Sequence, residues 1–393
     1  MQELGIQGRE VNNLAVLIWT DSINDVDWYT FLNLWQTINR IPFSNVLCRK
    51  SSLTRCIQQI STHFPNLYSF YPKSFILPYK QSAFLRAKQS KNCTWIIKPD
   101  GGSLGNGITI LKPGCDYPPD NNLAVAQQYL ESFILDKKKF DLRVYALVAS
   151  IDPLEIYVYR NGLSRFCSDE TDQSSVYSQI TNVTLNKQNP EFDGFQDISR
   201  LISDTFERLK NEFNADINKL WEEIDNVVTL TIISGLKYMK TGVKSYLKPS
   251  IVSRCFQIFG FDILLDTNLH PHVIEVNYRP NLEYHRGPER RMKVGMIKDA
   301  IAIAAPFESL QSALDYRKLG WSNETWRTYL MNNPELKELI KSSKEKAIQL
   351  SNFVKVYPTT GELNKTYQDV IKVVENMKLE SIPGSFLIPE RDM

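Results

Sequence analysis

The sequence predicts an α+β fold, in which strands and amphipathic helices come from different stretches of the chain. Residues 261–266 and 272–277 alternate apolar and polar side chains, as half-buried strands do. Residues 94–111 have the pattern of a buried strand, a glycine-rich loop and a second strand. Between residues 198 and 239, apolar residues recur at three- and four-residue steps, the spacing of amphipathic helices.

The two alternating segments predict a hairpin whose link, residues 267–271, is rich in turn-forming residues. Paired across this link, Asp262 is expected opposite Glu275, and Asn277 follows two residues later on the same face. Two carboxylates and a carboxamide are hard oxygen ligands that suit Mg²⁺. The alternative is an ordinary hairpin whose polar face meets solvent. The opposite face is expected to pack in the core through Phe261, Ile263, Leu265, Ile274 and Val276.

The glycine-rich loop, residues 99–107, lies between two predicted strands and not between a strand and a helix. It therefore lacks the context of a Walker A or Rossmann motif. Its glycines still let backbone N–H groups approach an anion, and Lys98 at the end of the preceding strand supplies a point charge. We expect a flap that closes over phosphates; a flexible hairpin loop is the alternative.

A short strand is predicted over residues 125–130, and a second strand follows a lysine run within residues 137–148. In the second strand Asp141, Arg143 and Tyr145 share one face, whereas Leu142 and Val144 face the core. Lys139 differs from an ordinary surface lysine because it directly precedes an ordered strand.

Residues 157–166 predict a strand, a turn at Asn161-Gly162 and a second arginine, Arg165. A polar segment, residues 180–187, then precedes the helical region.

Taken in order, these segments resemble the tubulin tyrosine ligase-like family, whose catalytic core is an ATP-grasp fold. The resemblance covers roughly residues 38–360 and is nearest to the tubulin polyglutamylase branch, through residues 139–165. The matching motifs, in this sequence, are WIIKP with the glycine loop, QQY, KFDLRVYALV, YRNGLSRF, ITNVTLNK, FGFDILLD and EVNYRP.

The resemblance implies an ATP-dependent ligase that adds an amino acid, expected to be glutamate, to side-chain carboxylates of tubulin tails through an acyl phosphate, forming ADP and phosphate. It implies ATP and Mg²⁺ as cofactors, with the metal on Asp262, Glu275 and Asn277. The implied catalytic residues are Asp141, Arg143, Arg165 and Asn182. The implied nucleotide-binding residues are Lys98, Gly105, Gly107, Gln127, Gln128, Tyr129, Leu130 and Lys139.

Several positions depart from the family pattern, namely Leu104, Asn106, Gln179, Tyr278 and Arg279. Leu104, Asn106 and Gln179 motivate an alternative function, a microtubule-associated protein that keeps the ligase fold with weak or no activity. The intact metal residues and both arginines argue against that alternative. A third possible function is a small-molecule carboxylate–amine ligase. Separately, the substitution at Tyr278 leaves glycine as an alternative to glutamate as the added amino acid.

The composition of the 393 residues, 42% apolar and 23% charged, is that of an ordinary globular protein. We expect a cytosolic monomer that acts on the cytoskeleton, including the cilium, flagellum or basal body, without a nucleic-acid or membrane partner. Six scattered cysteines and four histidines argue against a zinc site. The expected domains are residues 1–47 (N-terminal), 48–127 (central, with the flap), 128–300 (ATP-grasp) and 301–393 (helical extension and tail).

Because the net charge is only +2, attraction to acidic tubulin tails must come from local basic patches. The candidates are Lys137, Lys138, Lys139, Arg286, Arg290, Arg291 and Lys293.

Overall fold

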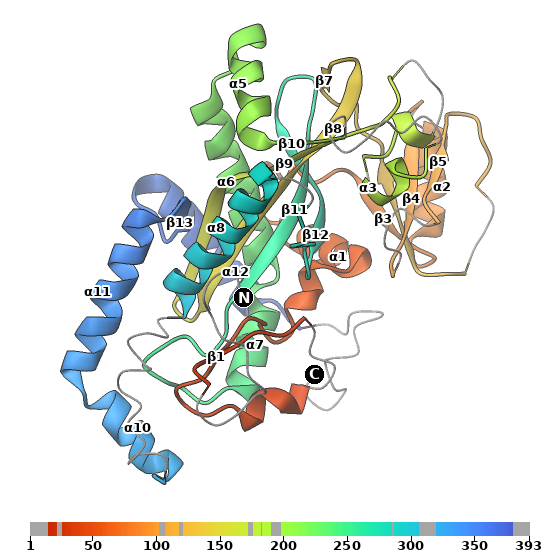
Figure 1. The fold of residues 1–393 in the computed structure, drawn as a ribbon. Helices are drawn as coiled ribbons and strands as arrows, with labels where there is room; N and C mark the ends of the chain where they lie inside the picture. Colours follow the sequence, from red (N-terminus) through yellow and green to blue (C-terminus); the bar gives the residue numbers. More distant parts are fainter. Residues whose placement is uncertain are drawn as a thin grey trace.

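The computed structural model describes residues 15–21, 26–90, 92–101, 107–117, 121–171, 176–181, 183–189, 198–284, 287–305 and 320–379. Within these ranges the chain combines helices with two antiparallel sheets, so the predicted α+β class is confirmed (Figure 1). None of the helices in the described ranges is long and apolar enough to span a membrane.

The smaller sheet contains the strands on either side of the glycine-rich loop. Its order is β3 (Ser74–Leu77), β6 (Ala124–Gln128), β4 (Trp95–Pro99) and β5 (Thr109–Leu111), all antiparallel. The three strands predicted here are confirmed to within two residues at each end. The sheet packs on α2 (Gln81–Ser90), where Phe84 meets Trp95 edge-on with ring centroids 5.3 Å apart.

The larger sheet forms the centre of the molecule (Figure 1). Its order is β10 (Ser199–Leu201), β9 (Leu154–Phe166), β8 (Lys138–Ile151), β11 (Gln257–Leu265) and β12 (Pro271–Asn277). Two further strands pair at its margins, β13 (Phe353–Tyr357) with β9 and β7 (Ile134–Leu135) with β8. The segment beyond residue 300, which the sequence predicts as a helical extension of the ATP-grasp domain, supplies β13 to this sheet.

Each face of the central sheet has its own hydrophobic core. On one face, Leu142 and Val144 pack in the core that contains α6 (Ile217–Ser234) and α7 (Leu236–Tyr246). On the other face, α8 (Gly287–Ala304) covers the sheet. Tyr145 shares the face of Arg143, as predicted, but it is fully buried in this second core.

The amphipathic stretch predicted over residues 198–239 is divided into three helices. The first, α5 (Ile202–Phe213), ends at Asn214, whose φ of 54° lies in the left-handed region that terminates helices. Gly235 separates α6 from α7, and a Cβ there would lie 2.7 Å from Leu47 Cδ2, so the close approach requires glycine.

The prediction of a turn at Asn161-Gly162 is wrong, because β9 runs without interruption from Leu154 to Phe166. Val144 pairs with Gly162 and Ala146 pairs with Val158, so the extra residues of β9 form a bulge. Glycine fits this bulge because a Cβ at position 162 would lie 2.2 Å from the Arg143 carbonyl oxygen.

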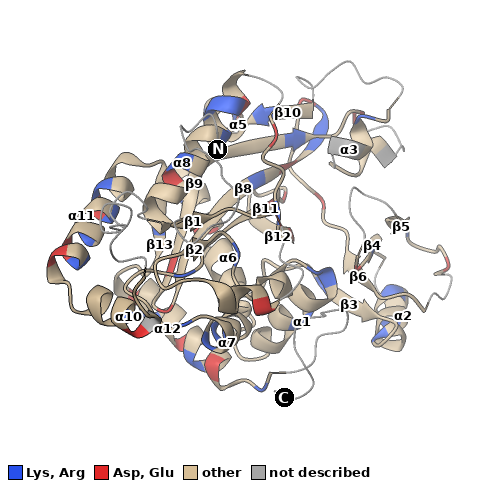
Figure 2. Ribbon diagram, turned by 60° about the horizontal axis from the view of Figure 1, so that its bottom comes forward, with Lys and Arg blue, Asp and Glu red and all other residues tan. Residues whose placement is uncertain are grey.

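The remaining elements surround these two sheets. N-terminal to them lie β1 (Leu17–Ile18), η2 (Val26–Phe31), β2 (Thr37–Ile38), η3 (Ser44–Leu47) and α1 (Lys50–Ser61). Between β9 and β10 lie η4 (Val176–Ser178) and α3 (Val183–Asn186). The C-terminal helices are α10 (Asn323–Met331), α11 (Pro334–Leu350) and α12 (Gly361–Asn376). Figure 2 shows both basic and acidic residues along α11.

Candidate active site

The hairpin of β11 and β12 places the three predicted metal residues together. Asp262 pairs with Glu275, and Asn277 pairs with Gly260, as the side-chain alternation predicts. The register depends on a bulge, because Ile263 pairs with Val273 and Ile274 is left as the extra residue.

The bulge also changes which side chains enter the core. Val273 and Val276 pack in the core with Phe261, Ile263 and Leu265, whereas Ile274 is only partly buried. The prediction of Ile274 as a core residue is therefore wrong, since an extra residue reverses the alternation beyond it.

Charged residues from four neighbouring strands form a row across the central sheet. Arg165 of β9 lies opposite Asp141 of β8, and Arg143 of β8 lies opposite Asp262 of β11, which in turn faces Glu275 of β12. Directly opposed residues of antiparallel strands place their side chains on the same face. The strand pairing therefore brings five of the predicted site residues together from three parts of the sequence.

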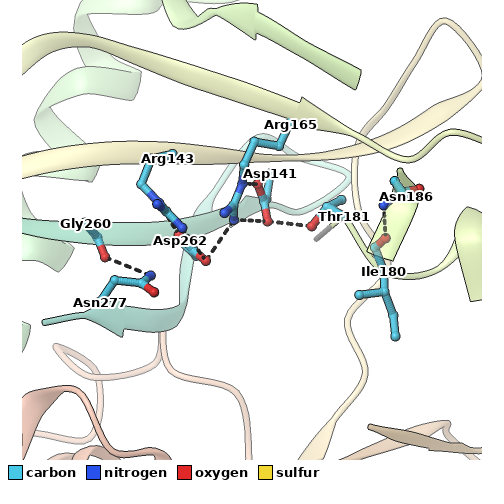
Figure 3. Close-up of polar contacts among 9 residues, drawn as sticks. All are labelled: Asp141, Arg143, Arg165, Ile180, Thr181, Asn186, Gly260, Asp262 and Asn277. Atoms are coloured by element: carbon cyan, nitrogen blue, oxygen red, sulfur yellow. Dashed lines mark hydrogen bonds and ion pairs between the residues drawn. The ribbon is translucent and has the colours of Figure 1, made fainter. Parts of the chain in front are cut away.

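Two aspartates and two arginines of this row form one network (Figure 3). Arg143 Nε donates to Asp262 Oδ1 at 2.6 Å, and Arg165 Nη2 lies 2.8 Å from Asp262 Oδ2. Arg165 also forms a bidentate contact with Asp141: its Nε donates to Oδ1 at 2.7 Å and its Nη2 donates to Oδ2 at 2.6 Å. Burial alone would raise the pKa of Asp262, but the Arg143 and Arg165 guanidiniums outweigh it and hold this pKa at about 2.

Asp141 is occupied by partners within the protein. Besides Arg165, it accepts a hydrogen bond of 2.5 Å from Thr181 Oγ1. This favours a positioning role for Asp141, which holds the Arg165 fork, over the direct contact with the amino acid or nucleotide that the sequence suggested. Thr181 was not predicted as a site residue, although it stands beside Asn182 in the same motif.

The predicted residue Asn182 lies outside the described residues, but the segment around it is anchored. Asn186 is fully buried, its Nδ2 donates to the Ile180 carbonyl at 2.8 Å, and its Oδ1 accepts from the backbone N–H and the hydroxyl of Ser168. The structural role of Asn186 was also not predicted. The polar motif of residues 180–187, which contains Asn186, was the only sequence feature that could have indicated it.

Two lysines of the predicted nucleotide site are buried. Lys98 of β4 is 7% exposed, and its Nζ donates to Gln127 Oε1 at 2.8 Å. Lys139 Nζ donates to the Tyr129 hydroxyl at 2.9 Å and lies 4.1 Å above the centre of that ring. Within the described part of the chain neither ammonium group has a carboxylate within salt-bridge distance, so each can accept an anionic ligand.

The charge of Lys98 is sensitive to its surroundings. Burial lowers the pKa of Lys98 to about 8, while Glu275 opposes this shift and Lys50 and Lys139 add to it. The effect of Glu275 and Lys139 on Lys98 shows that the smaller sheet and the central sheet meet at this point.

Residues 128–130, predicted to bind the nucleotide, have most of their backbone N–H groups occupied within the protein. The N–H of Gln128 donates to the Lys73 carbonyl at 2.8 Å, and that of Tyr129 donates to the Thr94 carbonyl at 2.9 Å. In the described ranges the N–H of Leu130 has no such partner. Of the three N–H groups, only that of Leu130 remains for a nucleotide edge.

The glycine-rich loop is described only at its two ends, and Leu104, Gly105 and Asn106 lie outside the described residues. Gly107 has a φ of +72°, and a Cβ there would lie 3.0 Å from Pro99 Cγ. At the other end, Asp100 accepts from Arg49 Nε at 2.9 Å and from the Ser51 N–H at 2.8 Å, which ties the loop to the start of α1. The role of Asp100 as this anchor was not predicted.

The donor set fits Mg²⁺ bound together with phosphates. Among the described residues no group of three or more His, Cys, Asp or Glu side chains could by itself hold a metal. Asp262, Glu275 and Asn277 supply two carboxylates and one carboxamide, and Mg²⁺ commonly combines one or two carboxylates with water and nucleotide phosphates. Asn277 Nδ2 donates to the Gly260 carbonyl at 3.2 Å, an orientation that leaves its Oδ1 as the coordinating atom.

We expect Lys98→Ala to weaken ATP binding about 10- to 100-fold without unfolding the protein, because the removed ammonium group contacts Gln127 and not an apolar side chain, and is predicted to bind phosphate. Lys98 carries its charge below its pKa of about 8, so the ATP affinity of the parent should fall as the pH rises from 7 to 9. Lys98→Arg keeps its charge at every pH in this range and should lose the dependence. Calorimetric titration with ATP at three pH values measures both effects; unchanged affinity in Lys98→Ala would contradict the assignment.

Residues 30–312 match the tubulin-tyrosine ligase family. Tubulin polyglutamylase ttll6 of Danio rerio is 33% identical over 299 residues, which cover 73% of this chain and 38% of that protein. Tubulin polyglutamylase TTLL11 of Mus musculus is 33% identical over 308 residues, covering 69% of this chain and 42% of that protein. A probable beta-tubulin polyglutamylase of Tetrahymena thermophila is 29% identical over 304 residues, covering 73% of this chain and 25% of that protein. The matched regions thus span less than half the length of these relatives.

Proposed function

Because the chain belongs to the tubulin-tyrosine ligase family, we propose that it ligates an amino acid, glutamate, to side-chain carboxylates of tubulin tails in a reaction driven by ATP. Relatives named tubulin polyglutamylases support the choice of substrate and amino acid. The observation that supports the proposal is a pair of buried ammonium groups without a carboxylate partner in the described ranges, Lys98 of the smaller sheet and Lys139 of the central sheet. Lys98 interacts electrostatically with Lys139 and with the Asp262–Glu275 pair. This is the charge arrangement that phosphoryl transfer requires.

In the first step, an oxygen of the acceptor carboxylate attacks the γ-phosphorus of ATP, the bond to the bridging oxygen breaks, and ADP leaves. Lys98 and Lys139 bind the phosphates, and the Leu130 N–H meets the edge of the adenine. Asp262, Glu275 and Asn277 hold Mg²⁺, which when bound neutralises charge on the phosphates. The product of this step is an acyl phosphate.

In the second step, the amine of the incoming amino acid attacks the acyl carbon, phosphate leaves, and the nitrogen loses a proton. Arg143 stabilises the oxygens of the acyl phosphate. Arg165, held by Asp141, pairs with the carboxylate of the amino acid. Both arginines contact Asp262 in this structure, so in the proposed reaction they exchange that carboxylate for the anionic groups of the substrates.

Incubation of the protein with ATP, radiolabelled amino acids and microtubules tests this function. Glutamate label on tubulin supports the proposal, and glycine label would change the amino acid. Absence of label despite ATP binding would favour the alternative, a microtubule-associated protein without activity. Label only on small carboxylic acids would indicate a small-molecule ligase.

The proposed setting is the cytosol, where the protein acts as a monomer on microtubules, including those of cilia, flagella or basal bodies. Its partners are the acidic tails of tubulin and a free amino acid, without a nucleic-acid or membrane partner. The printed names of the relatives support tubulin as the partner.

The proposed docking patch for acidic tails is smaller than the sequence indicated. Lys293 is 3% exposed and forms an ion pair with Glu289 at 2.8 Å, so its assignment to the patch is wrong; the helical repeat turns it inward. Lys139 is also buried, and Arg286 lies outside the described residues. The remaining members of the patch are Lys137, Lys138, Arg290 and Arg291.

We expect reversal of Arg290 and Arg291 to glutamate to weaken microtubule binding about 10-fold at low salt, because attraction becomes repulsion. Exposed charges are screened over about 10 Å at 0.1 M salt, so parent binding should also fall steeply between low and moderate salt. Co-sedimentation with microtubules measures both effects. If the protein binds equally well to microtubules stripped of their tails, the proposed docking patch is wrong and docking on the microtubule lattice is favoured.

A further inference from the structure

A cavity of about 440 Å³ lies where the N-terminal strands meet the start of β11 and the segment that follows β12. Its polar walls include two arginines, Arg40 and Arg279, and two asparagines, Asn39 and Asn281. Its apolar walls are formed by Trp19, Phe256, Ile258, Pro280 and Leu282. The roles proposed above for the active-site residues do not involve this cavity.

Arg40 is an unusual residue to find in such a wall. It is 6% exposed, and its guanidinium donates only to backbone carbonyls, to Asp21 from Nε and Nη2 at 3.2 and 2.8 Å and to Asn39 from Nη1 at 2.8 Å. The guanidinium also lies 5.2 Å from the centre of the Tyr278 ring. Carbonyl groups satisfy hydrogen bonds but do not neutralise the charge, and in the described ranges no carboxylate lies within salt-bridge distance of Arg40.

Arg279 brings a second positive charge to the same cavity. Both side chains line the cavity. Burial lowers the pKa of Arg40; Tyr278, Asp21 and Tyr29 oppose this shift, and Arg279 adds to it. In the part of the chain that the structure describes, Arg279 has no ion-pair partner either. Asp21 and Glu283 line the same cavity, but neither forms an ion pair with Arg40 or Arg279 among the described residues. The two guanidiniums therefore remain able to bind an anion together.

The cavity wall is fixed by a buried carboxamide. Gln257 is fully buried; its Nε2 donates to the Tyr278 carbonyl at 2.9 Å, and its Oε1 accepts from the Ile41 N–H at 3.0 Å. These bonds tie the segments that carry Arg279 and Arg40 to the same point of β11. The backbone next to each arginine is therefore held in place before any ligand binds.

The cavity adjoins the active site through Gly260. A Cβ on Gly260 would lie 2.8 Å from Pro280 Cβ and 3.1 Å from Arg143 Cδ. Pro280 lines the cavity, whereas Arg143 belongs to the active-site network, so one residue separates the two. A chain whose acceptor residue reaches Arg143 can place a neighbouring residue in the cavity.

We propose that this cavity is a subsite for one carboxylate side chain of an acidic polypeptide acceptor, bound by Arg40 and Arg279 next to the residue that is modified. The inference rests on the proposed function for the identity of the acceptor. The apolar wall receives the methylene groups of the acidic side chain. Asp21 and Glu283 also line the cavity and repel a second carboxylate, which limits the subsite to one acidic residue.

Binding of fluorescein-labelled peptides, measured by anisotropy at low salt without ATP, tests the subsite. The peptides carry a central glutamate flanked by glutamates that are replaced with glutamine one at a time. We expect Arg279→Gln to weaken binding of the all-glutamate peptide about 10-fold. At one peptide position, replacing glutamate with glutamine should weaken binding to the parent by a similar factor. The same replacement should leave binding to Arg279→Gln unchanged, because the two groups that interact directly have then both been removed.

Lys337→Gln is the matched control, because it removes one exposed positive charge from α11, on a different part of the chain from the cavity-lining residues. Arg40→Lys keeps the charge but loses the fork and its hydrogen bonds to the Asp21 and Asn39 carbonyls, so it should weaken binding of the same peptide and also lower the melting temperature. Arg279→Gln, at an exposed position, should weaken binding with the melting temperature close to that of the parent. The proposed subsite is contradicted if Lys337→Gln loses as much peptide affinity as Arg279→Gln. It is also contradicted if no peptide position shows coupling to Arg279. If the parent ligates glutamate and the coupling is absent, only the subsite fails; if the coupling is present without ligation, only the proposed function fails.

Discussion

Glu275→Gln should lower the rate of ligation more than about 100-fold while the free energy of unfolding stays close to that of the parent. The change removes one charged oxygen from the proposed metal site and keeps the size of the side chain. Glu275 is partly exposed and lies opposite Asp262 on the polar face of the hairpin, so no core contact is lost. Ligation assays with saturating ATP and urea denaturation measure the two quantities.

Glu338→Gln serves as the control, since it makes the same chemical change at an exposed position of α11. Excess Mg²⁺ should restore part of the activity of Glu275→Gln if the defect is weakened metal binding. A Glu275→Gln protein that ligates at the rate of the parent would show that the metal lies elsewhere.

The second large effect is expected at Arg165, which is buried between Asp141 and Asp262. Arg165→Gln leaves Asp141 without its cationic partner, and removing one member of a buried ion pair costs about 3–5 kcal/mol. Ligation should fall about 1,000-fold, because the carboxylate of the incoming amino acid also loses its partner.

Arg165→Lys separates the two effects. It keeps the positive charge and should recover part of the stability, but a single ammonium cannot reproduce the bidentate contact with Asp141, so ligation should stay low. Chemical denaturation and ligation kinetics provide the comparison. Full ligation by the lysine variant would argue that Arg165 contributes charge alone and does not orient the amino acid.

The sequence predicted the members of the charged row better than their partners. Alternation along 140–148 was sufficient to place Asp141 and Arg143 on one face of their strand, and alternation across the 261–277 hairpin was sufficient to place Asp262 beside Glu275, because strand periodicity is a local property. That the two faces coincide follows from the pairing of β8 with β11. That Arg165 binds Asp141 and Asp262 together depends on the order of β9, β8 and β11, which local patterns do not contain.

The errors have a common physical origin in tertiary packing. Asn161-Gly162 has the sequence of a tight turn, yet the neighbouring strand β8 continues past it and converts the turn into a bulge. Lys293 has the sequence of a surface lysine, but α8 turns it toward Glu289 and the Glu283 carbonyl. The cavity at Arg40 joins residues more than 200 positions apart, so only the folded chain reveals it.

The pairing of β13 with β9 has a consequence for how the protein is made. The outer edge of β9 is covered by β10 at one end and by β13 at the other, and β13 lies almost 200 residues later in the chain. During synthesis, the edge around Val158 and Tyr159 therefore emerges from the ribosome long before its partner does. Unpaired strand edges recruit other chains, so the interval before residue 357 appears is the period of greatest risk of aggregation and of greatest need for a chaperone.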